Sequence, residues 1–203
     1  GMMQKLFSQQ IRFKADDGSE FGEWENTKLG ELLIKHEEKT DRNNQYPVLT
    51  SSRNGIFFQK DYFAGQDVAS SDTTGYNVVP YGYFTYRHMS DDLVFKFNIN
   101  TLCEKGIVST LYPVFTIKET HLNKYFLQTV LNEGKEFKNF AIMQKQGGSR
   151  TYMYYSKLRE LILNIPTLPE QTKIANFLSA IDQKIDVVSE QLEQAKLWKK
   201  GLL

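Results

Sequence analysis

Apolar residues recur with a helical period along the C-terminal part of the chain. After Pro169 the steps between successive apolar positions are 3, 4, 4, 3, 4 and 3 residues, ending at Ala195. A period near 3.5 predicts one long helix over about residues 170–200, with an apolar seam that packs against a partner. Five acidic and five basic residues balance on that helix, so its outer face is expected to be solvated. The candidate helix–helix contacts are Ile174, Phe177, Ile181, Ile185, Val188 and Leu192.

The middle of the chain, about residues 45–160, has a different pattern. Short β-branched and aromatic runs are separated by Gly, Asn, Asp and Pro, which predicts a twisted, β-rich domain. One helix is expected over residues 120–133 with Thr120 as its N-cap, and a short one over 156–163. Residues 2–13 carry apolar positions at helical spacing. The expected class is α+β, with an N-terminal helical segment (1–14), a β-rich domain (20–166) and the long helix (167–203).

Composition narrows the classes of function. The 203 residues include 25 Lys+Arg and 24 Asp+Glu, so nucleic-acid binding would need a local basic patch. Apolar residues make up 40%, which suits a folded core. The single cysteine, Cys103, excludes an internal disulfide framework and suits a reducing cytoplasm, where we expect the protein. The sequence holds no apolar run of the roughly 18 residues that a membrane span needs, so no membrane association is expected.

Catalytic motifs are missing from the sequence. There is no phosphate-binding glycine loop, and His36, His88 and His121 lie far apart without neighbouring ligands. Acid-x-Lys triplets of the kind used by nucleases occur at 37–39 and 182–184, but such triplets arise often by chance. We therefore predict no catalytic residue, no metal site and no bound cofactor.

A locally basic segment runs over residues 135–159, with six basic residues against one acid. Inside it, two glycines allow close backbone approach to a ligand, and a serine and an arginine suit phosphate. The glutamines of this loop could reach base edges. A flexible solvated turn is the equal alternative. The candidate DNA contacts in this loop are Lys145, Gln146, Gly147, Gly148, Ser149 and Arg150.

Two further clusters, at 51–63 and 81–90, mix aromatic, amide and basic side chains. That mixture suits reading of a DNA groove, and it equally suits the exposed face of an ordinary sheet. The candidate DNA contacts in these clusters are Arg53, Asn54, Lys60, Tyr83, Tyr86 and Arg87.

Several stretches together resemble the specificity subunits of type I restriction-modification systems. The strongest is the opening of the long helix, Leu168-Pro169-Glu170-Gln171 with the Ile-Ala, Phe-Leu and Ile-Asp pairs that follow it. Gly30-Glu31-Leu32, Tyr86–Ser90, Gly106–Ser109, Gly147–Arg150 and the Lys-Lys-Gly-Leu-Leu ending also match.

The resemblance implies a target-recognition domain that reads one half of a split double-stranded DNA site. It also implies that the chain is not catalytic and docks modification subunits, which transfer methyl groups from S-adenosylmethionine. A motor-nuclease subunit can join the complex, so ATP and magnesium are expected only in partner subunits.

Family members usually carry two recognition domains and two antiparallel long helices, whereas this chain has one of each. Joining its end to its start recreates the interior junction of a full-length subunit, so a cut-out half, a natural half-subunit and a split reading frame all fit. The seam is then expected to pair with a second copy or second half, the alternative being that it folds back on its own domain. A coiled-coil adaptor that no longer binds DNA is the alternative function.

Overall fold

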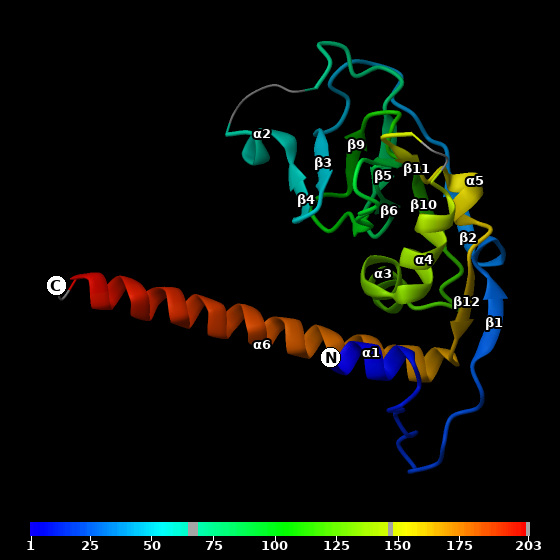
Figure 1. Cartoon of the computed structure of the whole chain (residues 1–203). Coiled ribbons are helices and arrows are strands. Elements are labelled where there is room, and N and C mark those ends of the chain that lie inside the picture. The colour runs from blue at the N-terminus through cyan, green and yellow to red at the C-terminus, as the bar shows by residue number, and fades with distance from the viewer. Residues whose placement is uncertain (65–68, 146–147, 202–203) are drawn as a thin grey trace. The chain divides into compact units, whose positions relative to one another are not determined.

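The computed structural model of the chain describes residues 1–64, 69–145 and 148–201. The chain divides into two compact units (Figure 1). One unit is 24–165, and the other combines 1–23 with the segment from residue 166 onward. Helices and strands are mixed along the chain, and the last element of the described residues is a long helix. This confirms the expected α+β class.

Antiparallel pairing organises the strands of the 24–165 unit. Among the described residues, a four-stranded sheet has the order β2-β10-β6-β8, and the remaining strands form the pairs β1-β12, β3-β4, β5-β9 and β7-β11. Their bounds are β1 Glu25–Lys28, β2 Leu33–His36, β3 Leu49–Ser52, β4 Gly55–Phe58, β5 Asn77–Pro80, β6 Phe84–Thr85, β7 Met89–Ser90, β8 Asn98–Ile99, β9 Lys105–Val108, β10 Val114–Ile117, β11 Thr151–Tyr152 and β12 Ile162–Ile165. The prediction of a domain built from short strands is therefore confirmed.

Aromatic rings fill the core beneath the four-stranded sheet. Phe84 and Phe115 stack with their ring centroids 4.9 Å apart, and Tyr86 packs on Phe97 at 4.5 Å. The Tyr86 hydroxyl donates a hydrogen bond of 2.9 Å to the Met153 carbonyl. Because burial leaves Tyr86 with no exposed surface, it raises the pKa of this hydroxyl far above its usual value. The prediction that Tyr86 contacts DNA is therefore wrong.

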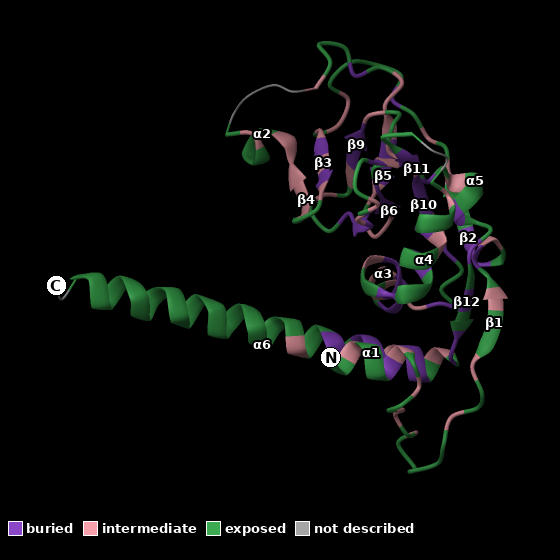
Figure 2. Cartoon of the chain, in the orientation of Figure 1, coloured by how far each residue is buried: buried purple, intermediate pink, exposed green. Residues whose placement is uncertain are grey.

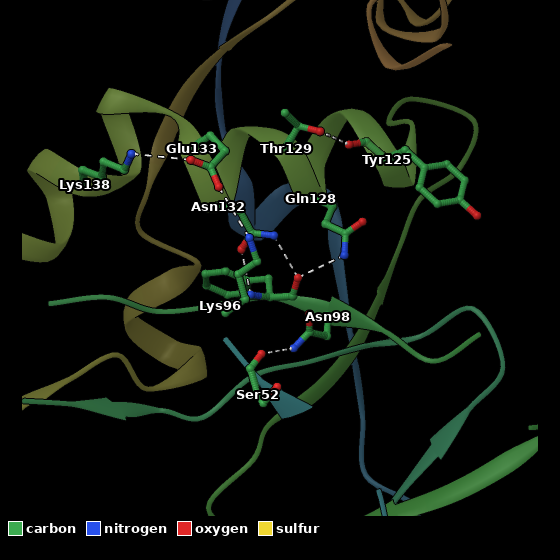
Figure 3. A network of polar contacts seen from close by, with 10 residues as sticks. Ser52, Lys96, Asn98, Tyr125, Gln128, Thr129, Asn132, Glu133 and Lys138 are labelled. Atoms are coloured by element: carbon green, nitrogen blue, oxygen red, sulfur yellow. Dashed lines mark hydrogen bonds and ion pairs between the residues drawn. The ribbon is translucent and has the colours of Figure 1, made fainter. Parts of the chain in front are cut away.

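Two consecutive helices, α3 (Lys124–Glu133) and α4 (Lys135–Met143), pack within this unit. The Asn123 side chain accepts bonds from the amides of Tyr125 and Phe126, so α3 begins after Asn123 and not after Thr120 as expected. α4 was not predicted, since the helix expected from the sequence covered only residues 120–133. In Figure 3, Gln128 and Asn132 extend from α3 toward the strand below. Both donate to the Phe97 carbonyl, and Asn132 also accepts from the Phe97 amide at 2.8 Å.

The segment expected to form a helix over 156–163 instead contains a short helix and a strand. The helix α5 ends at Leu158 (Tyr155–Leu158), and β12 then pairs antiparallel with β1. The turn between them lies against Gly30 of the 3-10 helix η1 (Leu29–Glu31), whose amide donates to the Arg159 carbonyl at 2.9 Å. A Cβ atom at Gly30 would lie 2.9 Å from that oxygen, so the close approach requires glycine. The other short helix, α2, covers Gln59–Tyr62.

The second unit contains α1 (Met2–Phe7) and α6 (Leu168–Gly201). α1 is shorter than the helical segment expected over residues 2–13, because Gln9 adopts a positive φ of 58° and ends it. The connector that follows is bonded to the start of α6. Phe13 packs edge-on against Phe177 at 5.4 Å, and Lys173 donates to the Lys14 carbonyl at 2.8 Å.

Burial changes along α6, as Figure 2 shows. Ile174, Ala175 and Leu178 are buried, Phe177 and Ile181 are half-buried, and every described residue from 182 onward is exposed. The predicted seam therefore begins as a packed surface and continues as an uncovered one. Across the described part of the chain, no helix is long and apolar enough to cross a membrane.

Candidate nucleic-acid interface

The hairpin β3–β4 carries Arg53 and Asn54 at its turn. Its strands pair in the register Ser52↔Gly55, which leaves these two residues at the tip, both exposed. Asn98, which is buried, holds the tip from below. Its amide donates to the Ser51 hydroxyl at 2.9 Å and to the Ser52 carbonyl at 2.8 Å, as Figure 3 shows for the pair Asn98 and Ser52. Buried amides satisfied in this way fix the backbone that they bind, so the tip is held against the sheet.

Arg53 forms a two-bond ion pair with Asp92. Its Nη1 and Nη2 atoms donate to the two carboxylate oxygens of Asp92 at 2.8 and 2.7 Å. The hydrogen bonds from Arg53, and next that from Ser90, lower the pKa of Asp92 to about 2. The arginine therefore faces a carboxylate that is charged at neutral pH.

Arg150 forms a second ion pair with the neighbouring acid, Asp91. Strand β11 pairs with β7 in the register Thr151↔Ser90, so the residues just beyond, Arg150 and Asp91, lie opposite each other. The Nε atom of Arg150 donates to Asp91 Oδ1 at 2.9 Å. Two arginines that are 97 residues apart in sequence thus meet one acidic dipeptide, and we call these four residues the arginine–aspartate cluster.

A cavity of about 190 Å³ adjoins this cluster. It brings Arg53 together with Arg87, another predicted contact, and with Lys96, which is half-buried. The lining residues are Thr50, Ser51, Ser52, Arg53, Tyr62, Arg87, Met89, Ser90, Asp91, Val94, Phe95, Lys96 and Tyr112. Three cations and two tyrosines around one hollow form a surface with the chemistry that phosphates and bases require.

Other predicted contacts lie outside this surface. Lys60 is exposed on α2 and lines a separate cavity of about 390 Å³ with Phe58 and Asp61. Tyr83 is half-buried, with its ring 5.0 Å from that of His36, so it packs beside the core. Lys145, Gly148 and Ser149 are exposed near Arg150, while the predicted contacts Gln146 and Gly147 lie outside the described residues.

Several residues of the surface were missed in the sequence. Asp91 and Asp92, which directly follow the Tyr86–Ser90 block, were not among the predicted contacts. Tyr152 and Tyr154, which follow Arg150, stack with their ring centroids 5.6 Å apart, and Tyr154 also stacks on His88 at 5.0 Å. Both tyrosines are 40% or more exposed. The available signal in the sequence was that Tyr152 and Tyr154 are two residues apart, which places both on one face of an extended segment.

No group of three or more His, Cys, Asp or Glu residues able to hold a metal ion occurs in residues 1–64, 69–145 and 148–201. The two acids of the cluster are instead bonded to arginines.

Comparison with known proteins assigns the chain to a family. The family model for the type I restriction modification DNA specificity domain matches residues 22–197. The chain belongs to this family. Specificity subunits are generally non-catalytic, which agrees with the expectation from the sequence for this specificity domain.

Individual relatives are distant. The specificity domain is 28% identical over 82 residues to a protein of Methanocaldococcus jannaschii assigned as a type I restriction enzyme MjaX specificity subunit. That match covers 40% of this chain and 19% of the relative. The crystal structure of the HsdS subunit from Thermoanaerobacter tengcongensis has a TM-score of 0.51 and 14% identity, over 93% of this chain and 44% of that one.

The S subunit from M. genitalium has a TM-score of 0.49 and 18% identity, over 89% of this chain and 44% of that one. The specificity domain thus spans less than half the length of these solved subunits. The likeness to the T. tengcongensis subunit establishes a shared fold.

Proposed function

We propose that the chain is a DNA-recognition unit of a type I restriction-modification specificity subunit. In this proposal the 24–165 unit reads one part of a split double-stranded target. Membership of the specificity-domain family supports this role. The observation that carries it is the convergence of Arg53, Arg87, Lys96 and Arg150 at one surface, although the charges of the whole chain nearly cancel.

The proposed contacts divide by chemistry. Arg87 and Lys96 at the cavity, and Arg150 with Lys145 and Ser149 beside it, bear donors suited to phosphate oxygens. Arg53 and Asn54 stand at the exposed tip of a hairpin, and a two-stranded element of this size fits the major groove of DNA. The same surface therefore has groups for holding the DNA backbone and groups for reading bases.

The role proposed for α6 is assembly. Ile185, Val188 and Leu192 are 57, 61 and 53% exposed, although they continue the seam that is buried at Ile174. An apolar stripe of this kind pairs with another long helix, either of a second copy or of a second half-subunit. Modification subunits, and a motor-nuclease subunit, would dock on the assembly. They would supply S-adenosylmethionine, ATP and magnesium, and this chain would need no cofactor of its own.

Selection from a randomised double-stranded DNA pool tests the proposal. The chain is co-purified with a matching modification subunit, and the modification subunit alone is the control. We expect enriched sequences that depend on the chain. Two inverted half-sites at fixed spacing indicate a dimer, and a single short site indicates one recognition unit acting alone. No enrichment above the control would reject DNA recognition and favour a coiled-coil adaptor.

A further inference from the structure

Asp92 is held in place independently of Arg53. Its Oδ1 atom accepts hydrogen bonds from the Ser90 hydroxyl at 2.9 Å and from the Val94 amide at 3.2 Å. Ser90 is buried and lies in β7, which is paired with β11. The chain turns between these residues through Leu93, which has a positive φ of 66°. A non-glycine residue persists in that conformation only where its surroundings determine it, so the carboxylate has a defined position.

The backbone on the other side of the pair is also fixed. Asn98 donates to the Ser52 carbonyl at 2.8 Å (Figure 3). It also donates to the Gly55 carbonyl at 3.3 Å, and Ser52 and Gly55 are the two residues that flank the tip. The Asn54 amide donates to the Ser52 hydroxyl at 3.1 Å. Arg53 therefore extends from an anchored turn to an anchored carboxylate, which fixes the orientation of its guanidinium group.

The orientation leaves one edge of the guanidinium available. Asp92 occupies the end formed by Nη1 and Nη2. The side edge, formed by Nε and the second hydrogen of Nη2, has no partner among the described residues, and the Arg53 side chain is 59% exposed. A planar fork of two parallel donors matches a pair of acceptors lying side by side, and not a single point charge.

We propose that Arg53 reads a guanine through its Nε–Nη2 edge, and that Asp92 is the positioning residue that aims it. This inference rests on the proposed role in DNA recognition. Guanine presents N7 and O6 as adjacent acceptors in the major groove, and a bidentate arginine is their usual partner. The ligand is thus a G·C base pair of the target.

Charge argues for a base and against a phosphate as the ligand of Arg53. The Asp92 carboxylate cancels the charge of the guanidinium, and Asp91 stands beside it. A neutralised arginine attracts a phosphate weakly, whereas its directional donors to a neutral base remain. Arg150 is also paired with a carboxylate, so it differs from Arg53 in geometry and not in charge: a single bond from Nε to Asp91 leaves its Nη1–Nη2 end for phosphate.

Binding measurements on the selected target, with every base pair substituted in turn, test this assignment. The full chain, with the modification subunits used in the selection, is compared with Arg53→Lys and Asp92→Asn. We expect Arg53→Lys to lose roughly 10- to 100-fold of the preference for guanine at one position. Asp92→Asn keeps an acceptor for Ser90 and Val94. It should weaken the preference at that same position, while affinity for unrelated DNA stays equal or rises.

Asp41→Asn is the matched control, since it removes an exposed carboxylate from the same unit outside the cluster. Urea unfolding of each variant shows whether it is folded. If Asp92→Asn does not fold, Arg53→Lys still tests the inference. A uniform loss of affinity for all sequences, with a shallower salt dependence, would make Arg53 a phosphate contact and overturn the inference. The inference would also be overturned if Arg53→Lys left every base preference unchanged, or if the target required no G·C pair. If the chain without substitutions shows no base preference at any position of the target, the proposed function fails as well.

Discussion

Arg12 binds Glu170 through two hydrogen bonds, from Nε to Oε1 at 3.1 Å and from Nη2 to Oε2 at 2.8 Å. Glu170 has no exposed side-chain surface and lies in the first turn of α6, where a negative charge is favourable. Arg12 also donates to the Gly22 carbonyl at 2.6 Å. The bonds to Glu170 raise the pKa of Arg12, so this ion pair ties the N-terminal connector to the start of the long helix.

Arg12→Met should therefore destabilise the unit made by 1–23 and α6. The substitution removes the charged partner of a buried carboxylate, and we expect a loss of about 3 kcal/mol in the free energy of unfolding. Urea unfolding followed by circular dichroism measures it. Lys14→Met is the control, because Lys14 pairs with Glu20 at the surface and should change little. Equal effects of the two substitutions would contradict a structural role for the buried pair.

Arg150→Ala should weaken DNA binding for all sequences alike. If the arginine contacts a phosphate, the slope of log affinity against log salt should fall by about one unit. Fluorescence anisotropy at several salt concentrations measures the slope. Arg42→Ala removes an exposed arginine outside the cluster and serves as the control. A slope that is unchanged relative to this control would remove Arg150 from the interface.

Asp92 should remain ionised at unusually low pH. Hydrogen bonds from Arg53 and Ser90 lower its pKa from 3.8 to about 2. Because the folded pKa lies below the unfolded one, the pair stabilises the folded state above pH 4, and that stabilisation is lost as the pH falls toward 2. Carboxyl NMR titration measures the midpoint. Arg53→Met should move it upward, whereas Arg150→Met should not, since Arg150 bonds to Asp91. Identical midpoints in all three proteins would contradict the pairing.

Gly106→Ala should destabilise the 24–165 unit. A Cβ atom at Gly106 would lie 2.3 Å from Leu49 Cδ1, which is inside the core, so overpacking should cost about 1–3 kcal/mol. Thermal or urea unfolding measures the loss. Gly22→Ala, where a Cβ meets nothing within 4 Å, is the control. In the Gly106→Ala background, Leu49→Ala should cost less than it does alone, because the new methyl group fills part of the cavity. Additive costs would argue against the contact.

Replacing Ile185 and Val188 by lysine should abolish self-association through α6. Both side chains are more than half exposed on the seam, and charges there would prevent apolar packing between helices. Sedimentation at several protein concentrations measures association. Gln183→Lys with Gln194→Lys adds the same charge on the opposite face and is the control. A lysine-substituted seam that still associates, or a parent chain that stays monomeric alone and with partners, would contradict the assignment.

The contrast between α6 and the β-rich unit shows which helices and strands could be predicted from the local pattern of the sequence. A helix is specified by neighbours three and four residues apart, so the 3.5-residue period of residues 174–195 sufficed to predict α6. Strand runs such as 77–86 and 106–117 were recognisable for the same reason. The predictions of secondary structure were wrong where a competing residue or a tertiary contact outweighed the local signal. Asn123, and not Thr120, is the N-cap of α3. Residues 162–165 form a strand because they pair with β1.

The sequence by itself determined the class of fold, the long helix with its apolar seam, and a set of residues with DNA-binding chemistry. Only the tertiary structure decided which of those residues act together. Burial removed Tyr86 from the set, and the β7–β11 register placed Arg150 opposite Asp91. Asp92, which the sequence did not single out, holds Arg53 across 39 residues. Such pairings depend on strand register and on the packing of segments distant in sequence, and local periodicity carries no information about either.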